Sequence, residues 1–258
     1  MSAIETSQVH LHIGGFQLKN VTLSIPSEKI TAIVGPNGSG KSTLLQTMTR
    51  LLVPDQGEVL VQDKPLPQYK TMEFAKTVAL MTQSKHTIPN LTVGELVAYG
   101  RSPYKRLFDH SNQEDKDIVQ WAMEVTHTLR HENRMFHTLS GGEQQKARLA
   151  MALAQKTNII LLDEPTTFLD IAHQLDVMEM LVKINQAYRM TIIMVLHDLQ
   201  QAANYCHYLV AMKKGEIQKT GNPKEVITAE FLKDIYQIEA KVRLEDEDYV
   251  NIMPLRKL

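Results

Sequence analysis

One glycine-rich run constrains this 258-residue chain more than any other feature of its sequence. An apolar stretch, Lys29–Val34, precedes the run, and a helix-forming segment, Lys41–Leu52, follows it. That order predicts a strand, a loop and a helix that together bind a phosphate group. A chance match in a glycine-rich turn is the alternative, and the flanking elements disfavour it. The run fits G-x-x-x-x-G-K-[ST], and we call it the phosphate loop: Gly35, Pro36, Asn37, Gly38, Ser39, Gly40, Lys41, Ser42 and Thr43.

The chemistry of phosphate binding predicts roles for two side chains of the loop. Glycines let the backbone wrap around a phosphate with its N–H groups, and the helix N-terminus adds a positive partial charge. We expect Lys41 to reach the β- and γ-phosphates of a nucleotide and Ser42 to bind Mg²⁺. The loop therefore predicts a site for a nucleoside triphosphate and its magnesium ion.

Two further apolar runs, Asn158–Leu162 and Thr191–Leu196, share the unbroken character of Lys29–Val34. Such runs predict strands that are buried on both faces, as in a parallel sheet. Polar residues follow each run, and ligands bind at the carboxyl edge of open α/β sheets. The three runs therefore predict one site that is assembled from distant parts of the sequence.

Three of those polar residues are candidates for hydrolysis. Asp163, at the end of a buried strand, would hold Mg²⁺ directly or through water. Alternation along the strand would turn Glu164 the other way, and we assign it as the group that polarises or deprotonates the attacking water. His197 would hydrogen-bond a γ-phosphate oxygen and orient that water. The alternatives are that Asp163 and Glu164 form a carboxylate pair at the surface and that His197 is a capping or core histidine.

A second phosphate receptor is predicted at Ser140, Gly141 and Gly142, which open a helix-forming segment, Glu143–Gln155. Backbone amides and a hydroxyl at the positive end of a helix suit an anion. By itself, the same pattern is also that of an ordinary helix N-cap. A chain with two phosphate receptors needs a reason for both.

The other segments predict an antiparallel β layer and further helices. Alternating patterns and turn residues favour strands at Val9–Leu11, Leu18–Ile25 and Glu58–Val61. Helical spacing favours Val93–Gly100 and Asp117–Leu129. In the second helix an apolar stripe is expected to pack in the core: Ile118, Trp121, Ala122, Val125 and Leu129. Towards the end we expect strands at Tyr208–Met212 and Glu216–Lys219 and a helix near Ala229–Ile235.

Composition excludes several classes of protein. Hydrophobic residues make up 43% and charged residues 22% of the chain, which is globular rather than disordered usage. The net charge of −1 disfavours nucleic-acid binding through bulk electrostatics. The apolar runs are too short to span a bilayer, and no basic start precedes an apolar stretch. We therefore expect no signal peptide, an intracellular chain, and membrane contact only through a partner.

Cysteine and histidine give little support for a metal centre. The single cysteine, Cys206, excludes a disulfide framework and is expected to be half-buried and inert. His127 and His131 stand four residues apart on a predicted helix face, which makes them weak candidates for a transition-metal site.

Several motifs together resemble those of ATP-binding-cassette (ABC) ATPases. In order and spacing they are the phosphate loop, Gln83, a signature segment LSGGEQQ at Leu139–Gln145, Ile160–Pro165, Leu169-Asp170 and His197. The resemblance covers nearly the whole chain. It implies one α/β nucleotide-binding domain over residues 1–258, with the fold of P-loop NTPases. A RecA-like parallel core would carry an antiparallel β subdomain and an inserted α-helical subdomain at about residues 88–156.

The resemblance also explains the second phosphate receptor. In this family two cassettes face head to tail, and each MgATP lies between the phosphate loop of one subunit and the signature segment of the other. It implies that Ser140, Gly141 and Gly142 contact the γ-phosphate that the other subunit holds. Gln83 would lie near Mg²⁺ and the water and signal to the membrane partner. Asp170 would lie at the seam of the dimer.

Finer features resemble one importer subfamily, which transports iron–siderophores, haem and cobalamin. They lie at Leu91–Tyr104, Asp163–Gln174, Val195–Cys206 and Gly221–Thr228. Such importers pair two ATPase copies, at the cytoplasmic face of the membrane, with two permease subunits and an extracytoplasmic binding protein. We expect ferric siderophore as the cargo, with haem or cobalamin as alternatives. A soluble cassette ATPase and an ATP-dependent binding module without turnover are the other readings.

One position departs from the family pattern. Family members stack adenine on an aromatic residue upstream of the phosphate loop, and no tyrosine stands at the expected place here. His12 is the first candidate to replace it, and Phe16 is the second. A weaker stacking partner predicts looser or less adenine-selective binding, not loss of catalysis.

Overall fold

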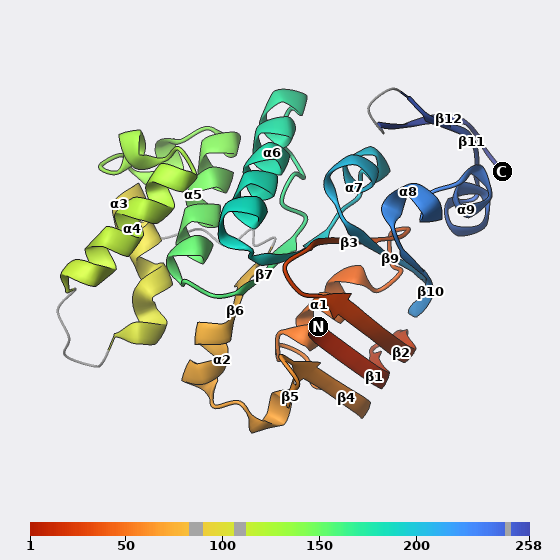
Figure 1. Cartoon of the computed structure of the whole chain (residues 1–258), viewed down its shortest axis with the longest axis horizontal. Coiled ribbons are helices and arrows are strands. Elements are labelled where there is room, and N and C mark those ends of the chain that lie inside the picture. The colour runs from red at the N-terminus through yellow and green to blue at the C-terminus, as the bar shows by residue number, and fades with distance from the viewer. Residues whose placement is uncertain (83–89, 106–111, 246–248) are drawn as a thin grey trace. The chain divides into compact units, whose positions relative to one another are not determined.

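The computed structural model describes residues 1–82, 90–105, 112–245 and 249–258. Its elements are labelled in Figure 1, and they divide into two compact units. Unit 1 comprises Met1–Tyr69 and Thr191–Leu258, and unit 2 comprises Lys70–Met190. Each unit contains parallel strands together with helices, so the predicted α/β class is confirmed.

The parallel strands of unit 1 form its apolar centre. β3 pairs in parallel with β8 on one side and with β9 on the other, while β10 runs antiparallel to β9. Every residue of β3 and β8 is buried, as unbroken apolar runs predict. The bounds are β3 (Ile30–Val34), β8 (Thr191–Val195), β9 (Tyr208–Lys213) and β10 (Glu216–Gly221).

An antiparallel sheet with the strand order β2-β1-β4-β5 completes the β structure at the start of the chain. Its strands are the red and orange arrows of Figure 1. Buried and exposed side chains alternate along most of β2, so one face packs inward and the other meets solvent. The predicted antiparallel layer is confirmed. The bounds are β1 (Ser2–Ile13), β2 (Phe16–Pro26), β4 (Gln56–Val61) and β5 (Lys64–Pro65).

The first helix of unit 1 is shorter than predicted. It was expected to reach Leu52, but α1 (Lys41–Met48) ends four residues earlier. The Thr49 hydroxyl donates to the carbonyls of Leu45 and Gln46 at 3.1 Å each, and Arg50 adopts a left-handed φ of 62°. The hydroxyl bonds only weaken the last turn slightly, whereas the left-handed residue after it terminates the helix.

Apart from η1, which ends the N-terminal segment, the remaining elements of unit 1 lie in its C-terminal part. The predicted strands and the helix near Ala229 are found, whereas α7 and a terminal hairpin were not predicted. The elements are η1 (Leu66–Gln68), α7 (Leu199–Tyr205), α8 (Pro223–Val226), α9 (Ala229–Phe231), the π-helical turn η5 (Leu232–Tyr236), β11 (Ile238–Leu244) and β12 (Val250–Lys257).

Unit 2 surrounds one parallel strand pair with helices. β6 pairs with β7 so that Met81 stands opposite Leu162, and all five residues of β7 are buried. β6 and the long helix α6 were not predicted. The bounds are α2 (Thr71–Thr77), β6 (Val78–Met81), α3 (Val93–Ala98), η2 (Tyr99–Tyr104), α4 (Gln113–Val125), η3 (Leu129–His131), η4 (Phe136–Thr138), α5 (Gly141–Ala154), β7 (Ile159–Asp163) and α6 (Ile171–Tyr188).

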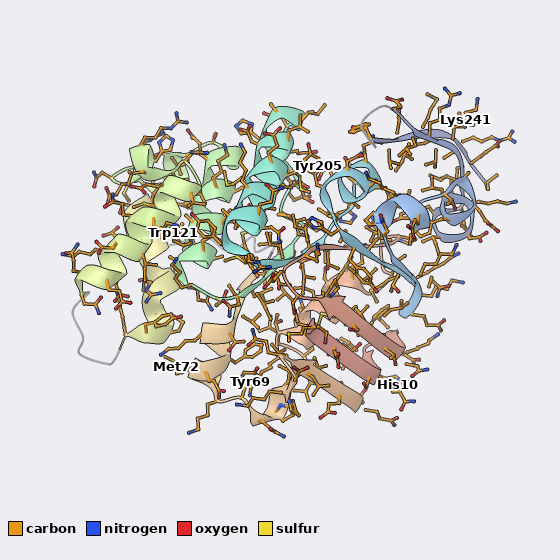
Figure 2. The ribbon with its side chains drawn as sticks, in the orientation of Figure 1. His10, Tyr69, Met72, Trp121, Tyr205 and Lys241 are labelled. Carbon is orange, nitrogen blue, oxygen red and sulfur yellow. The ribbon has the colours of Figure 1, made fainter. Side chains whose placement is uncertain are left out.

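The helix predicted at Asp117–Leu129 is displaced by four residues at both ends. α4 ends at Val125 because His127 adopts a left-handed φ of 56°, and the N–H groups of His127 and Thr128 turn back to the carbonyls of Glu124 at 3.0 Å and Met123 at 2.8 Å. Of the predicted core stripe only Ala122 is buried. The other four residues are half-buried, among them Trp121 on α4 (Figure 2): Ile118, Trp121, Val125 and Leu129. The Trp121 indole donates to the Tyr188 hydroxyl at 3.0 Å, and the Lys156 ammonium lies 3.5 Å from its ring centre.

Candidate functional site

The phosphate loop connects β3 to α1 as its sequence predicts. Gly40 is the N-cap of α1 and has a φ of 103°, a backbone conformation that side chains strongly disfavour. Space is limiting as well, because a Cβ on Gly40 would lie 2.6 Å from Cζ of the Phe16 ring. A Cβ on Gly35 would lie 2.2 Å from the carbonyl oxygen of Met212. Glycine is therefore required at both positions, Gly35 and Gly40.

Lys41 curls back over the loop from the first turn of α1. Its buried ammonium donates to the carbonyl oxygens of Gly35 at 2.9 Å and Pro36 at 3.1 Å. The first turn of α1, all of which the structure describes, holds no acidic side chain. A helix N-terminus and an ammonium therefore face the loop without a carboxylate in that turn, which is the electrostatic arrangement that suits a phosphate.

His197 lies at the same sheet edge as the phosphate loop. β3 and β8 are parallel neighbours, and Ile33 stands opposite Val195, so the loop and His197 leave the sheet side by side. His197 is exposed. The next residue, Asp198, caps α7 by accepting from the N–H groups of Gln200 at 2.7 Å and Gln201 at 3.2 Å. The cap fixes where the chain turns after His197.

Asp163 and Glu164 follow β7 in unit 2. Asp163 is buried and is the last residue of the strand. The expected strand alternation does not extend to Glu164, because this residue has left the strand and adopts a left-handed φ of 54°. Such a conformation costs roughly 1–3 kcal/mol and is held by its surroundings. One such contact is the Thr167 hydroxyl, which donates to Oε2 of Glu164 at 3.0 Å.

Ser140 caps α5 through a reciprocal bond with Glu143. The Glu143 N–H donates to Oγ of Ser140 at 3.4 Å, and Oε2 of Glu143 accepts from the Ser140 N–H at 2.9 Å and from its hydroxyl at 3.0 Å. Hydrogen bonds from Ser140, first of all from its backbone N–H, lower the pKa of Glu143. The helix end is thus internally satisfied, as in a capping box.

The start of α5 packs against the start of α6. A Cβ on Gly142 would lie 2.1 Å from Cδ2 of His173, so only glycine fits between them. Asp170 caps α6: its Oδ1 accepts from the His173 N–H at 2.9 Å and lies 2.8 Å from Nδ1 of that ring. These bonds, the backbone one first, lower the pKa of Asp170. Unit 2 therefore brings the signature segment beside Asp170.

The turn at Glu164 joins the same group. Gln145, on the first half of α5, donates from Nε2 to the carbonyl oxygen of Pro165 at 2.7 Å. That bond ties the residue after Glu164 to the signature helix. Unit 1 thus gathers the phosphate loop and His197, and unit 2 gathers Asp163, Glu164, the signature segment and Asp170.

His12 and Phe16, the two candidates for adenine stacking, contact different residues of unit 1. His12, on β1, has a 60% exposed side chain, and its Nδ1 lies 3.0 Å from Oδ2 of Asp55. The side-chain bond to His12 is the main reason why the pKa of Asp55 is lowered. Phe16, by contrast, places its ring against Gly40 of the phosphate loop.

Comparison with known proteins identifies the family. A family model described as ABC transporter matches residues 18–167. The chain belongs to the ABC transporter family. It is 45% identical to the petrobactin import ATP-binding protein FpuC of Bacillus anthracis, over 90% of this chain and 86% of that protein.

Two other ABC relatives are similar over most of both chains. The iron(3+)-hydroxamate import protein FhuC of Bacillus subtilis and the ferric enterobactin transport protein FepC of Escherichia coli are each 42% identical. Each alignment covers 94% of this chain and 90% of the relative. All three relatives are named as ATP-binding proteins, and the ABC cassette described here is an ATPase of this type.

Solved ABC structures share the fold. An inward-facing transporter described as metal-chelate type has a TM-score of 0.87 at 25% identity, covering 100% of this chain and 99% of that one. A dimeric bacterial ABC transporter cassette has a TM-score of 0.73 at 30% identity, covering 85% and 98%. The predicted P-loop ABC ATPase fold is confirmed.

Some predictions about this cassette meet a partial test or none. Gln83 lies outside the described residues. Cys206 is half-buried, and burial raises the pKa of its thiol, as an inert residue requires. Among the described residues, no cluster of His, Cys, Asp or Glu is arranged to hold a metal ion, so the His127–His131 alternative gains no support. No helix in the described part of the chain is long and apolar enough to cross a membrane.

Sequence reasoning missed the side chains that support the signature segment of this cassette. Glu143 stands three residues after Ser140, and that S-x-x-E spacing is a signal that would have found it. His173 and His131 have no comparable signal. Each is recognised only by its contacts, with Gly142 for His173 and with Glu143 for His131.

Proposed function

We propose that this cassette is the ATP-hydrolysing subunit of an importer that couples MgATP hydrolysis to uptake of ferric siderophore across the cytoplasmic membrane. The observation that carries the proposal is the set of three relatives, at 42–45% identity, named for petrobactin, iron(3+)-hydroxamate and ferric enterobactin. Their cargoes have iron chelation in common. A chain 42–45% identical to all three is best assigned to that cargo class, not to one chelate.

The phosphate loop would hold the nucleotide. Backbone N–H groups at Gly38 and Gly40 and the ammonium of Lys41 offer positive charge to the β- and γ-phosphates. The oxygens of Ser42 and Asp163 are the hard ligands that Mg²⁺ prefers, so this donor set fits the ion. When bound, Mg²⁺ neutralises charge on the phosphates.

Other residues would act on the water and the adenine. Glu164 accepts a proton from the attacking water. The water oxygen bonds to the γ-phosphorus while the bond from that phosphorus to ADP breaks, and inorganic phosphate is released. His197 and Gln83 contact the γ-phosphate and the water. For adenine stacking His12 remains the first candidate, although the position of Phe16 against Gly40 supports the second.

Two copies would complete each site. We assign Ser140, Gly141 and Gly142 to the γ-phosphate held by the other copy, and Asp170 to the seam between them. Their proximity within unit 2 supports this assignment, as does the similarity to a dimeric cassette. The dimer would dock peripherally on permease subunits at the cytoplasmic face, and an extracytoplasmic binding protein would deliver the cargo.

Replacing the proposed base tests the reaction. Glu164→Gln removes the proton acceptor but keeps the size of the side chain, so MgATP hydrolysis should fall about 100-fold or more while ATP binding persists. Phosphate release and equilibrium nucleotide binding measure the two effects. Glu179→Gln, at an exposed carboxylate on α6, is the control. Turnover near that of the wild type would remove Glu164 from its role.

The cargo needs a test in cells. A strain that lacks this gene should lose uptake of radiolabelled ferric hydroxamate or catecholate siderophore and regain it with the wild-type gene but not with Glu164→Gln. Loss of haem or cobalamin uptake instead would assign those cargoes. Unchanged uptake of all three would favour a soluble cassette ATPase.

A further inference from the structure

A tight backbone turn begins at Glu164, directly after β7. The Thr167 N–H donates to the carbonyl oxygen of Glu164 at 3.3 Å, which closes a four-residue turn with Pro165 at its second position. Proline suits that position because its ring restricts φ. Thr166, at the third position, is not among the described residues with a positive φ, which excludes a type II turn. The direction of the peptide between Pro165 and Thr166 is therefore restricted.

The same turn holds both the backbone and the side chain of Glu164. Besides the bond from its N–H, Thr167 donates its hydroxyl to Oε2 of Glu164 at 3.0 Å. The carbonyl and the carboxylate of Glu164 are thus tied to one residue of the turn. A rotation of the turn would therefore carry the carboxylate with it.

A hydrogen bond from α5 fixes how this turn is oriented. Pro165 is buried and has no N–H, so its carbonyl is its one polar group. Gln145 donates to that carbonyl from Nε2 at 2.7 Å, which is a short and direct bond. A carbonyl oxygen only accepts, so the amide nitrogen of Gln145 must face it. The middle peptide of the turn is thereby joined to the signature helix.

α5 is a firm anchor for that bond. The residues that follow Gln145 pack inward, since Ala147, Leu149 and Ala150 are buried. Before Gln145, only glycine fits between the start of α5 and His173. A helix that is closely packed both before and after Gln145 resists a shift that would replace a lost donor. Because a buried carbonyl needs a donor, we expect loss of the Gln145 amide to release the turn.

We infer that Gln145 is a positioning residue for Glu164, and that it acts through the carbonyl of Pro165. The inference rests on the proposed role of Glu164 as the base. Proton transfer needs a carboxylate oxygen within about 3 Å of the attacking water, so a small rotation of the turn lowers the rate. Nucleotide binding, which is assigned to the phosphate loop, should persist.

A purely structural role is the competing explanation, and a second glutamine on the same helix provides the control. Gln155, at the other end of α5, donates from Nε2 to the carbonyls of Ala75 and Val78 and is half-buried like Gln145. Gln145→Met and Gln155→Met each keep the length of the side chain and remove the donor. The full-length chain is purified in each case, and MgATP turnover, nucleotide affinity and thermal unfolding are measured.

If Gln145 positions Glu164, Gln145→Met lowers kcat about 5- to 10-fold, the scale of one hydrogen bond lost from a buried group, and leaves ATP affinity within twofold of the wild type. Gln155→Met destabilises the fold at least as much, because it removes two bonds, but keeps kcat within twofold. In the Glu164→Gln background, Gln145→Met lowers the remaining single-turnover rate by less than twofold, because the base that it positions is already gone.

Equal kcat values for Gln145→Met and the wild type would overturn the inference, as would equal losses of kcat in Gln145→Met and Gln155→Met. Loss of the folded state in Gln145→Met, or a loss of rate that is undiminished in the Glu164→Gln background, would assign Gln145 to packing. Glu164→Gln by itself separates this failure from failure of the proposed function. If Glu164→Gln lowers turnover and Gln145→Met does not, only the inference fails; if Glu164→Gln has no effect, the proposed base fails.

Discussion

The two helix ends assigned to phosphate are built in opposite ways. α1 begins at Gly40, which has no side chain to cap the helix, and Lys41 supplies a positive charge in the first turn. α5 begins at Ser140, whose side chain and backbone are both bonded by Glu143, a negative charge in the first turn. One end is open to an anion, and the other is already occupied by the protein's own carboxylate.

That difference assigns the two ends different tasks. An uncapped N-terminus beside an ammonium gains most from a phosphate, so α1 suits nucleotide binding by each subunit on its own. At α5 a phosphate must compete with Glu143 for the N–H and the hydroxyl of Ser140, so binding there is conditional. A conditional contact suits a step in which two subunits close and later separate.

Both ends share one device, a ring packed against a glycine. Phe16 lies where a Cβ on Gly40 would be, and His173 lies where a Cβ on Gly142 would be. The rings hold the two helix ends in place without using their backbone N–H groups. The contrast between the ends therefore lies in their charge and capping, not in how they are held.

The largest expected effect separates binding from turnover. Lys41→Met removes the ammonium and keeps the buried stem, so MgATP binding by the isolated chain should weaken about 100-fold, as expected for loss of a buried, charge-assisted contact. Ser140→Ala should leave that binding within twofold and lower turnover instead. Titration with a fluorescent ATP analogue and a phosphate-release assay distinguish the two. Equal losses of affinity in both variants would erase the contrast between the helix ends.

A smaller effect is expected at the glycine beside His173. Gly142→Ala should destabilise the fold by about 1–3 kcal/mol, because the new methyl group overlaps the ring. Gly141→Ala is the matched control, since its Cβ would meet only Leu169 at 3.9 Å. Urea unfolding measures both. His173→Ala should recover most of the loss in the Gly142→Ala background, and no recovery would mean that the ring is not the obstacle.

The sequence predicted those parts of the site that carry local signals. The phosphate loop, the buried strands and the Ser140 cap each have a pattern of residue types that physical chemistry restricts narrowly. Their positions in the structure agree with that pattern, including Asp163 at the last residue of its strand. Roles at the water and the phosphates were inferred from position and stay predictions.

Other parts of the site depend on contacts that no periodicity records. His131 and Arg134 reach Glu143 and Thr138 across a turn, and His173 reaches Gly142 from another helix. Glu164 leaves the strand at a left-handed φ, which alternation along a strand cannot predict. The helix at Gln113–Val125 was misplaced because the left-handed His127 ends it before the apolar stripe does.

The smallest expected effect tests the charge at the α5 end directly. Bonds from Ser140 lower the pKa of Glu143 below its ordinary 4.5, so the folded state favours the ionised carboxylate. This stabilisation is present above pH 4.5 and is lost as the pH falls through the lowered pKa of the folded state. The wild type should therefore exceed Glu143→Gln in stability by about 0.5 kcal/mol at pH 7, the scale of a negative charge at an exposed helix N-terminus, and the difference should vanish near pH 3.

Urea midpoints at the two pH values isolate Glu143, because all other carboxylates titrate alike in both proteins. A difference that stays constant with pH would mean that size or hydrogen bonding, rather than charge, sets the contribution of Glu143, and the electrostatic contrast between α1 and α5 would then be lost.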